Sequence, residues 1–458
     1  MQTSRTLLAG ALLVAGCDRA APISNAHAQP APAAPTQQAA PPSRPAQQAA
    51  QQPAQQPAQP ATARPPADLN VVMISIDSLR ADMPWSGYQR PIAPFLTELE
   101  ARSVSYTHAY ALSSYTSMSV GGFLGGRLPG ELRRDGYFFG TYPSRVLFFP
   151  EKLHAAGVRT ITANAHGYFR RGKAGFDQGF DVYELLPGLH WNSTTDVDIT
   201  GDRHAALARR LLSDPANTSG RFFAWFHFMD PHDQYQQHPG ATAWGRRMRD
   251  RYDGEVTYTD AQLRDFVTWI QQQPWGAHTA IIITADHGEG FGEHHHFRHG
   301  FELWQHVVRV PWFFVLPGAT PKRIDVSRSH LDLAPTILDL FGLPPEPEFT
   351  GRSLVPELYG SETPAERDVW IDLARTSDND RRRALVHGRY KIIAYGDDSR
   401  FEVYDVEADP GETTNLRASN RAVYDDMVAR YRAAQGSFRV ENPYSCRTLT
   451  GAPAGRGW

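Results

Sequence analysis

Three short apolar runs in this chain each end at residues that can bind a metal ion or an anion. The runs at 71–76, 222–229 and 280–284 are rich in Val, Ile or Phe and are followed by small or turn-forming residues, so they are predicted to be buried strands of an α/β sheet. The polar residues that follow these runs are Asp77, then Asp230 and His232, then Asp286 and His287. Ligands of such sheets bind beyond the carboxyl ends of the strands, so the pattern predicts one shared metal site.

The rest of the folded sequence supports an α/β class with a second, smaller unit. Helical patterns at 94–102, 200–212 and 331–343 alternate with the predicted strands. Further on, strand-like segments at 369–373, 390–395 and 401–406 precede a helical pattern at 422–434. We therefore expect a catalytic α/β domain at 68–350 and a small α+β C-terminal subdomain with its tail at 351–458.

The N-terminus has the features of an export signal. Residues 1–17 combine Arg5 with an apolar stretch too short to span a bilayer, and 14–17 resemble a lipobox that ends at Cys17. Residues 18–67 are rich in Ala, Pro and Gln and are predicted to form a disordered tether. We expect an exported lipoprotein anchored to the membrane of a bacterial cell envelope, facing the periplasm or the exterior. Cleavage after the small-x-small pattern at 26–28 is the alternative and would release a soluble protein.

The charge balance narrows the range of partners. The chain has 46 basic and 49 acidic side chains, for a net charge of -3, which gives no electrostatic reason to expect nucleic acid as a partner. The expected partners are a small-molecule, lipid or glycan ester as substrate and a membrane through the lipid anchor.

A series of motifs in order along the chain resembles the sulfatase-like branch of the alkaline phosphatase superfamily. The matching segments are 70–82, 230–232, 284–289 with 299–300, 309–311, 329–336, 351–354, and 404–405 leading to 409–412 and 415–416. The resemblance implies a central mixed sheet flanked by helices. It also implies a metal-assisted displacement at sulfur or phosphorus through a nucleophilic side chain.

By its position in the family pattern, the nucleophile is Thr116. The alternative is that this Ser/Thr-rich segment only caps a helix and has no catalytic role. Familiar sulfatases carry Cys or Ser in Cys/Ser-x-Pro-x-Arg, the first residue being oxidised to formylglycine, whereas this chain has Thr116, Met118 and Val120 at the corresponding positions. Its only cysteines are Cys17 and Cys446, so we expect a site of the non-formylglycine type.

The resemblance also implies the roles of the remaining site residues. One divalent ion would be held by Asp77, Thr116, Asp286 and His287, and imidazole with carboxylate suits Zn²⁺ or Mn²⁺ better than Ca²⁺. His232 and His299 match positions that contact the substrate anion, protonate the leaving group or bind a second ion. Asp230 could join His232 at a second metal ion or cap a turn, and 294–296 is interpreted as a solvated loop of three histidines.

These inferences predict a metal-dependent hydrolase of the sulfatase family that cleaves phosphate or sulfate esters through Thr116. Two alternatives stay open. One is a transferase of the phosphoethanolamine or phosphoglycerol type, and the other is a catalytically silent surface lipoprotein that binds anions or glycans.

Overall fold

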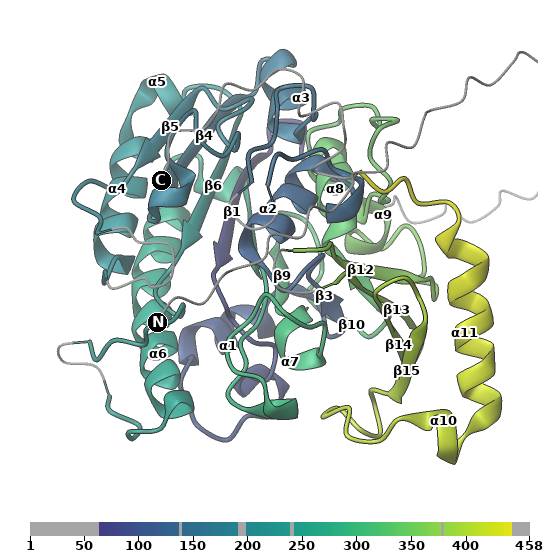
Figure 1. Cartoon of the computed structure of the whole chain (residues 1–458). Coiled ribbons are helices and arrows are strands. Elements are labelled where there is room, and N and C mark those ends of the chain that lie inside the picture. The colour runs from purple at the N-terminus through teal and green to yellow at the C-terminus, as the bar shows by residue number, and fades with distance from the viewer. Residues whose placement is uncertain (1–63, 137–139, 191–197, 239–241, 377–379, 442–458) are drawn as a thin grey trace, which may run out of the picture. The chain divides into compact units, whose positions relative to one another are not determined.

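The three predicted strands lie side by side at the centre of an eight-stranded mixed sheet (Figure 1). The sheet order is β10-β2-β9-β7-β1-β6-β4-β5. Strand β1 (Asn70–Ile76) pairs in parallel with β6 (Phe222–Phe228) on one side and β7 (Thr279–Ala285) on the other. The register places Ile76 opposite both Phe228 and Ala285, so the residues that follow the three strands leave the sheet at the same edge.

The computed structural model describes residues 64–136, 140–190, 198–238, 242–376 and 380–441. These residues belong to one compact unit, 60–458. The predicted signal peptide, Cys17, most of the tether and the C-terminal tail with Cys446 lie outside the described residues, and the domain boundaries proposed from the sequence stay predictions. Among the described residues, no helix is long and apolar enough to cross a membrane.

The outer strands make the sheet mixed, as the resemblance implied. Strands β4 (Arg159–Asn164) and β5 (Val182–Leu185) continue the parallel half, whereas β9 (Trp312–Val315) runs antiparallel to β7 and to β2 (Val104–Tyr106). Strand β10 (Lys322–Ile324) closes the far edge. A separate three-stranded sheet has the order β11-β3-β8, formed by Arg328–Ser329, Ala109–Tyr110 and Arg309–Val310.

Two groups of helices accompany the sheet (Figure 1). Helix α6 (Met248–Gln271) packs with α1 (Pro94–Ala101) and α4 (Gly201–Ser213), while α2 (Thr116–Gly125) packs with α3 (Phe149–Ala155) and α8 (Leu333–Leu340). Short helices α5 (Pro215–Thr218), α7 (Gln305–Val308) and α9 (Val355–Leu358) occupy the connections. The helices predicted at 94–102 and 200–212 are thus confirmed to within a residue, and the 331–343 pattern forms a shorter helix with Leu333, Ile337, Leu340 and Phe341 buried as expected.

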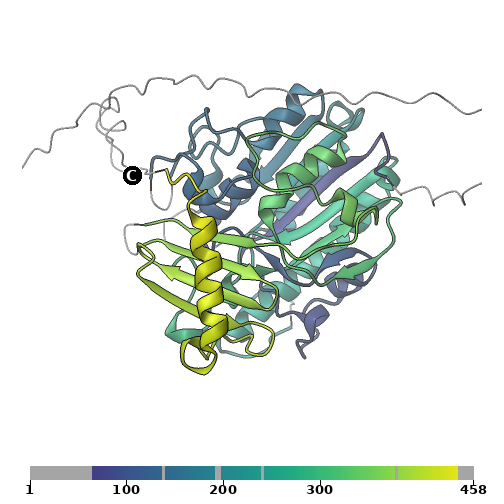
Figure 2. The same ribbon diagram turned by 90° about the vertical axis from the view of Figure 1, so that its right-hand side faces the viewer.

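The C-terminal residues form an antiparallel sheet covered by a helix (Figure 2). Its strands are β12 (Val369–Leu373), β13 (Arg382–His387), β14 (Tyr390–Tyr395) and β15 (Arg400–Asp405). The short helix α10 (Leu416–Ser419) is followed by α11 (Arg421–Gln435), which packs on β14 and β15 through buried Met427 and Tyr431. Strand β13 and the long helix α6 have no counterpart in the predictions from sequence.

Strand β12 connects this sheet to the segments on either side of α2. The Asp372 amide donates a hydrogen bond to the Leu112 carbonyl at 2.8 Å, and the Gly130 amide donates to Asp372 Oδ2 at 2.7 Å. Asp372 also forms a buried ion pair of 2.9 Å with Arg383 of β13. The ends of α2 are therefore fixed by residues that come much later in the chain.

Candidate active site

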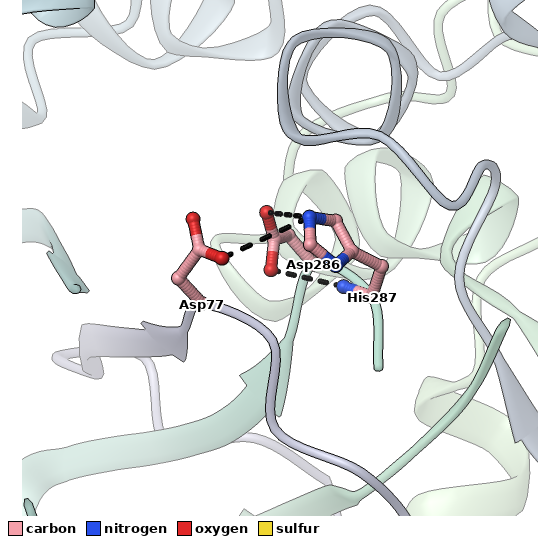
Figure 3. A group of neighbouring side chains, drawn as sticks. All are labelled: Asp77, Asp286 and His287. Atoms are coloured by element: carbon pink, nitrogen blue, oxygen red, sulfur yellow. Dashed lines mark hydrogen bonds and ion pairs between the residues drawn. The ribbon is translucent and has the colours of Figure 1, made fainter. Parts of the chain in front are cut away.

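Asp77, Asp286 and His287 converge at the edge of the sheet where β1 and β7 end (Figure 3). Each residue offers a ligand atom within 4.8 Å of the others, and all three side chains are fully buried. Two of the three predicted strand ends therefore form the cluster, with one candidate ligand after β1, two after β7 and none of the three after β6.

His287 has the protonation state that a metal ligand needs. Its Nδ1–H donates a hydrogen bond to the Gly288 carbonyl at 2.9 Å, so Nε2 carries the lone pair. That Nε2 lies 3.3 Å from Asp286 Oδ2 and 3.8 Å from Asp77 Oδ1. Burial and the nearby charge of His299 lower the pKa of His287 to about 3, so the ring is neutral at physiological pH.

The two carboxylates repel each other in the absence of a cation. Burial and the charge of Asp77 raise the pKa of Asp286 to about 7. Burial also opposes ionisation of Asp77, but the charge of His232 and a hydrogen bond from His227 outweigh it and hold the pKa of Asp77 well below its usual range. Asp286 Oδ1 accepts hydrogen bonds from the amides of Ser78 and His287, whereas its buried Oδ2 accepts none from the described residues.

These residues fit a divalent ion. Buried carboxylate oxygens in proteins normally have a partner. Asp286 Oδ2 has no hydrogen-bond partner among the described residues and lies close to the other candidate ligand atoms. Two carboxylates with one neutral imidazole form a set of donors that suits Zn²⁺ or Mn²⁺, whereas Ca²⁺ takes oxygen ligands.

Thr116 is the first residue of α2 and faces this cluster. Its hydroxyl donates a hydrogen bond to His287 Nε2 at 3.0 Å, and its Oγ1 lies 3.4 Å from Asp77 Oδ2. The positive end of the helix dipole lies at this residue and favours an anionic group beside it. Ser119 in the next turn donates to the Asp286 carbonyl at 2.6 Å, which fixes α2 against the end of β7.

Exposure distinguishes Thr116 from the neighbouring serines. Ser113, Ser114, Ser117 and Ser119 are each at most 2% exposed, whereas Thr116 is partly exposed. Thr116 is thus the one Ser or Thr hydroxyl of segment 113–119 that a substrate can reach without rearrangement of the helix.

His299 and His232 lie beside His287. The ring centroids are 4.2 Å apart for His287 and His299, and 5.1 Å apart for His232 and His299. His299 Nδ1–H donates to the buried Glu289 carboxylate at 3.2 Å, and His232 Nδ1–H donates to the Asp233 carbonyl at 2.6 Å. Burial opposes ionisation of Glu289, but the charge of His299 lowers the pKa of that carboxyl. The structure therefore brings all six predicted site residues together.

Two further histidines of this site were missed in the sequence. His227, inside β6, donates from Nε2 to Asp77 Oδ2 at 3.2 Å, while its Nδ1 accepts from the Ser75 hydroxyl at 2.8 Å. His166 follows β4 at the same edge of the sheet, and burial together with the charge of His232 lowers its pKa to about 3. The strand-end rule could have identified His166, whereas a histidine inside a strand gives no such signal.

Asp230 does not share a site with His232. It accepts a hydrogen bond from the Thr200 amide at 2.9 Å, at the start of α4, and burial raises its pKa to about 6. Asp230 thus caps the start of α4, and its carboxylate also lies close to His238 and Glu255, which form with it a second buried group that could hold a metal ion. In the loop of three histidines, His294 stacks on Trp304 at 3.9 Å and donates to the Gly411 carbonyl, while His295 and His296 are exposed.

Comparison with known proteins identifies the family of this chain. The sulfatase family pattern matches residues 69–343, and the pattern of the N-sulphoglucosamine sulphohydrolase C-terminal region matches 292–435. The chain is 31% identical over 215 residues to the Delta 4,5-hexuronate-2-O-sulfatase of Bacteroides thetaiotaomicron, with 43% of this chain and 44% of that protein covered. It is 30% identical over 210 residues to the choline-sulfatase of Rhizobium meliloti, with 43% and 40% covered. The chain thus spans less than half the length of these curated relatives.

Solved structures share the fold over most of the chain. A 2-O GAG sulfatase superposes with a TM-score of 0.65 at 19% identity, with 84% of this chain and 97% of that chain covered. The phosphonate monoester hydrolase of Agrobacterium radiobacter gives a TM-score of 0.64 at 18% identity, with 80% and 95% covered. Because the sulfatase pattern covers more than half of the sequence, this chain belongs to the sulfatase family.

Proposed function

We propose that this protein is a metal-dependent hydrolase that cleaves phosphate or sulfate esters, with Thr116 as the nucleophile. The observation that carries the proposal is the position of the Thr116 hydroxyl, which is accessible, lies 3.0 Å from His287 Nε2 and begins a ten-residue helix. A serine or threonine hydroxyl needs such activation because it is a weak nucleophile at neutral pH.

Asp77, Asp286, His287 and Thr116 would hold the ion. When bound, a divalent ion supplies Lewis-acid chemistry that favours the ionised hydroxyl and neutralises charge on the transferred group. Asp77, whose pKa is held low, and the neutral His287 are already in the states that ligation requires. Asp286 must lose its proton to join them, since its pKa is about 7.

The side chains account for each bond and proton of the transfer. Thr116 Oγ1 attacks phosphorus or sulfur, its proton passes to the medium, and the bond from the attacked atom to the leaving oxygen breaks. The leaving oxygen takes a proton from His299 or His232, whose rings lie next to each other. Glu289 accepts a 3.2 Å hydrogen bond from His299 Nδ1–H and so orients that ring. Water then cleaves the Thr116 ester and restores the hydroxyl; an acceptor alcohol in place of water would make the same protein a transferase.

Among the similar proteins, sulfate esters have support from the curated relatives, and phosphorus esters have support from a phosphonate hydrolase of the same fold. The curated relatives are named as sulfatases, and the phosphonate monoester hydrolase shares the fold. We propose that Thr116 acts without oxidation to formylglycine, because it is neither Cys nor Ser and lacks the Pro and Arg of that motif.

The experiment is turnover of a matched aryl sulfate, aryl phosphate and aryl phosphonate by the protein loaded with Zn²⁺, Mn²⁺ or Ca²⁺. Metal-dependent turnover that is lost in Thr116→Ala supports the proposal, as does an ester adduct mapped to Thr116 by mass spectrometry. Turnover that survives in Thr116→Ala, or an adduct on Ser114 or Ser117, would show that the nucleophile is wrong. Metal binding without turnover of any ester would favour the silent binding protein.

We also propose that the protein is an exported lipoprotein anchored through Cys17. The support is that Cys17 follows directly on the apolar stretch at 7–16 and ends the lipobox-like segment 14–17. Mass spectrometry of the mature N-terminus tests this, because a diacylated Cys17 supports the anchor and an N-terminus after residue 28 contradicts it.

A further inference from the structure

A basic pocket lies beside the two site histidines. Its volume is about 540 Å³, and its lining includes Arg246, Arg251 and Arg298 with Asp233 as the only acid. Met248, 37% exposed, adds an apolar contact surface to the same lining. Three guanidinium groups against one carboxylate leave the pocket with an excess of positive charge.

Two of these arginines have no role in holding the described fold together. Arg246 and Arg251 are exposed and form no ion pair with any residue in the described ranges. Arg249, in the same short segment, behaves differently, since it pairs with Asp82 at 3.0 Å and with Asp253 at 2.8 Å. Arg298 pairs with Asp233 at 2.9 Å and so satisfies the only acid of the pocket.

Arg246 and Arg251 lie at the start of a helix, where positive charge is unfavourable unless an anion is bound nearby. Helix α6 has 24 residues and begins at Met248, so Arg246 precedes it and Arg251 lies in its first turn. The helix dipole is positive at this end and repels cationic side chains. An anion in the pocket would relieve that repulsion as well as pair with the guanidinium groups.

The pocket is joined directly to the catalytic histidines. The Asp233 carbonyl accepts the Nδ1–H of His232, and Arg298 precedes His299 in the chain. The Arg298–Asp233 ion pair thus links the loop after β6 to the loop after β7 on the side where the leaving group takes its proton.

We infer that this pocket binds a second anionic group carried by the leaving alcohol of the substrate. The inference rests on the proposed function and narrows it to esters whose alcohol bears a further phosphate, sulfate or carboxylate. Arginine is suited to all three groups, because its planar donors match their oxygen atoms in pairs.

The test measures binding, so that it does not depend on turnover. Monophosphates of straight-chain diols with three to eight carbons are compared with the bisphosphates of the same diols, using isothermal titration calorimetry on metal-loaded Thr116→Ala protein. We expect at least one bisphosphate to bind about tenfold more tightly than its monophosphate, as one charge-assisted contact would give. The matching ω-phosphoryl sulfates and carboxylates then identify the preferred second group.

Substitution separates the pocket from the metal centre. Arg246→Ala combined with Arg251→Ala should remove the bisphosphate advantage and leave the monophosphate affinity unchanged. The matched control is Arg264→Ala, an exposed arginine of the same helix that pairs only with Asp265. Equal affinities of the two series in the Thr116→Ala protein, or an advantage that survives when Arg246→Ala and Arg251→Ala are added to it, would overturn the inference.

Failure of the proposed function gives a different result. If no monophosphate binds, the metal centre is not a phosphate site. The pocket is then tested with inorganic phosphate on metal-free protein by NMR. Shifts of the Arg246 and Arg251 Nε–H signals support an anion site, and unchanged signals overturn it.

Discussion

The variant Asp286→Asn should stabilise the metal-free protein and abolish its metal binding. Asparagine keeps the shape of the side chain, so its oxygen still accepts from the amides of Ser78 and His287. It removes the charge that faces Asp77 across the site. Its amide group can donate to His287 Nε2, 3.3 Å from the Asp286 Oδ2 position, once the Thr116 hydroxyl turns from Nε2 to Asp77 Oδ2, which lies 3.4 Å away. The substitution therefore removes the repulsion with Asp77 and gives the buried Oδ2 position a hydrogen-bond partner.

The pKa of Asp286 sets the size of this effect. The pKa rises from the ordinary 3.8 to about 7 in the folded protein, so the carboxyl holds its proton more strongly there than in the unfolded chain. The stability of the metal-free parent should therefore fall as pH rises from about 4 to about 7 and then level off. At about 1.4 kcal/mol for each pKa unit, the advantage of the Asn variant reaches about 4 kcal/mol at pH 8 and falls below about 2 kcal/mol at pH 5. Small movements of the two side chains reduce these upper values.

Urea unfolding with EDTA measures the effect. Parent and Asp286→Asn proteins are compared at pH 5 and pH 8, so that titrating groups common to both largely cancel. Adding Zn²⁺ or Mn²⁺ should reverse the order at pH 8, because only the parent binds the ion. An Asn variant that is less stable than the metal-free parent at pH 8 would refute the cost of ionising Asp286 in this buried position beside Asp77.

Four other substitutions address the proposed catalytic groups. Thr116→Ser should keep measurable turnover and the covalent adduct, whereas Thr116→Val should lower kcat by about a thousandfold or more in the same assay. His299→Ala should slow alkyl esters by about a hundredfold or more, and 4-nitrophenyl esters much less, since a good leaving group needs no proton; equal losses on both would exclude His299 as the acid. His227→Ala should weaken metal binding by about ten- to a hundredfold in a chelator competition, because Asp77 loses the hydrogen bond that orients it, and an unchanged affinity would contradict that role.

The proposed metal ligands were predictable because their signal is local. Asp77, Asp286 and His287 each follow an apolar run, and the parallel register of β1 with β7 brings the run ends together. Thr116 has no such signal and was identified only through the family pattern. His227 was missed because its contact with Asp77 depends on the pairing of β1 with β6, in which Ser75 lies opposite His227.

Features that depend on contacts between distant segments could not be predicted from the sequence either. Strand β13 begins with Arg382 and Arg383, whose charges hide a strand that lies between β12 and β14. The basic pocket needs the loop after β7 to approach the start of α6, and no spacing rule relates Arg298 to Arg251. Such contacts depend on tertiary packing, which the local sequence pattern of helices and strands does not determine.

The hydrogen bonds that Asp372 makes with Leu112 and Gly130 have a consequence for biosynthesis. Helix α2 is translated early, but the residue that secures the chain on both sides of it belongs to β12. A nascent chain therefore carries its proposed nucleophile, Thr116, on a helix that lacks these two hydrogen bonds until β12 has left the ribosome. The proposed site is therefore fully secured only after β12 has been translated, and a chain that stops before β12 holds every proposed catalytic residue without these two hydrogen bonds.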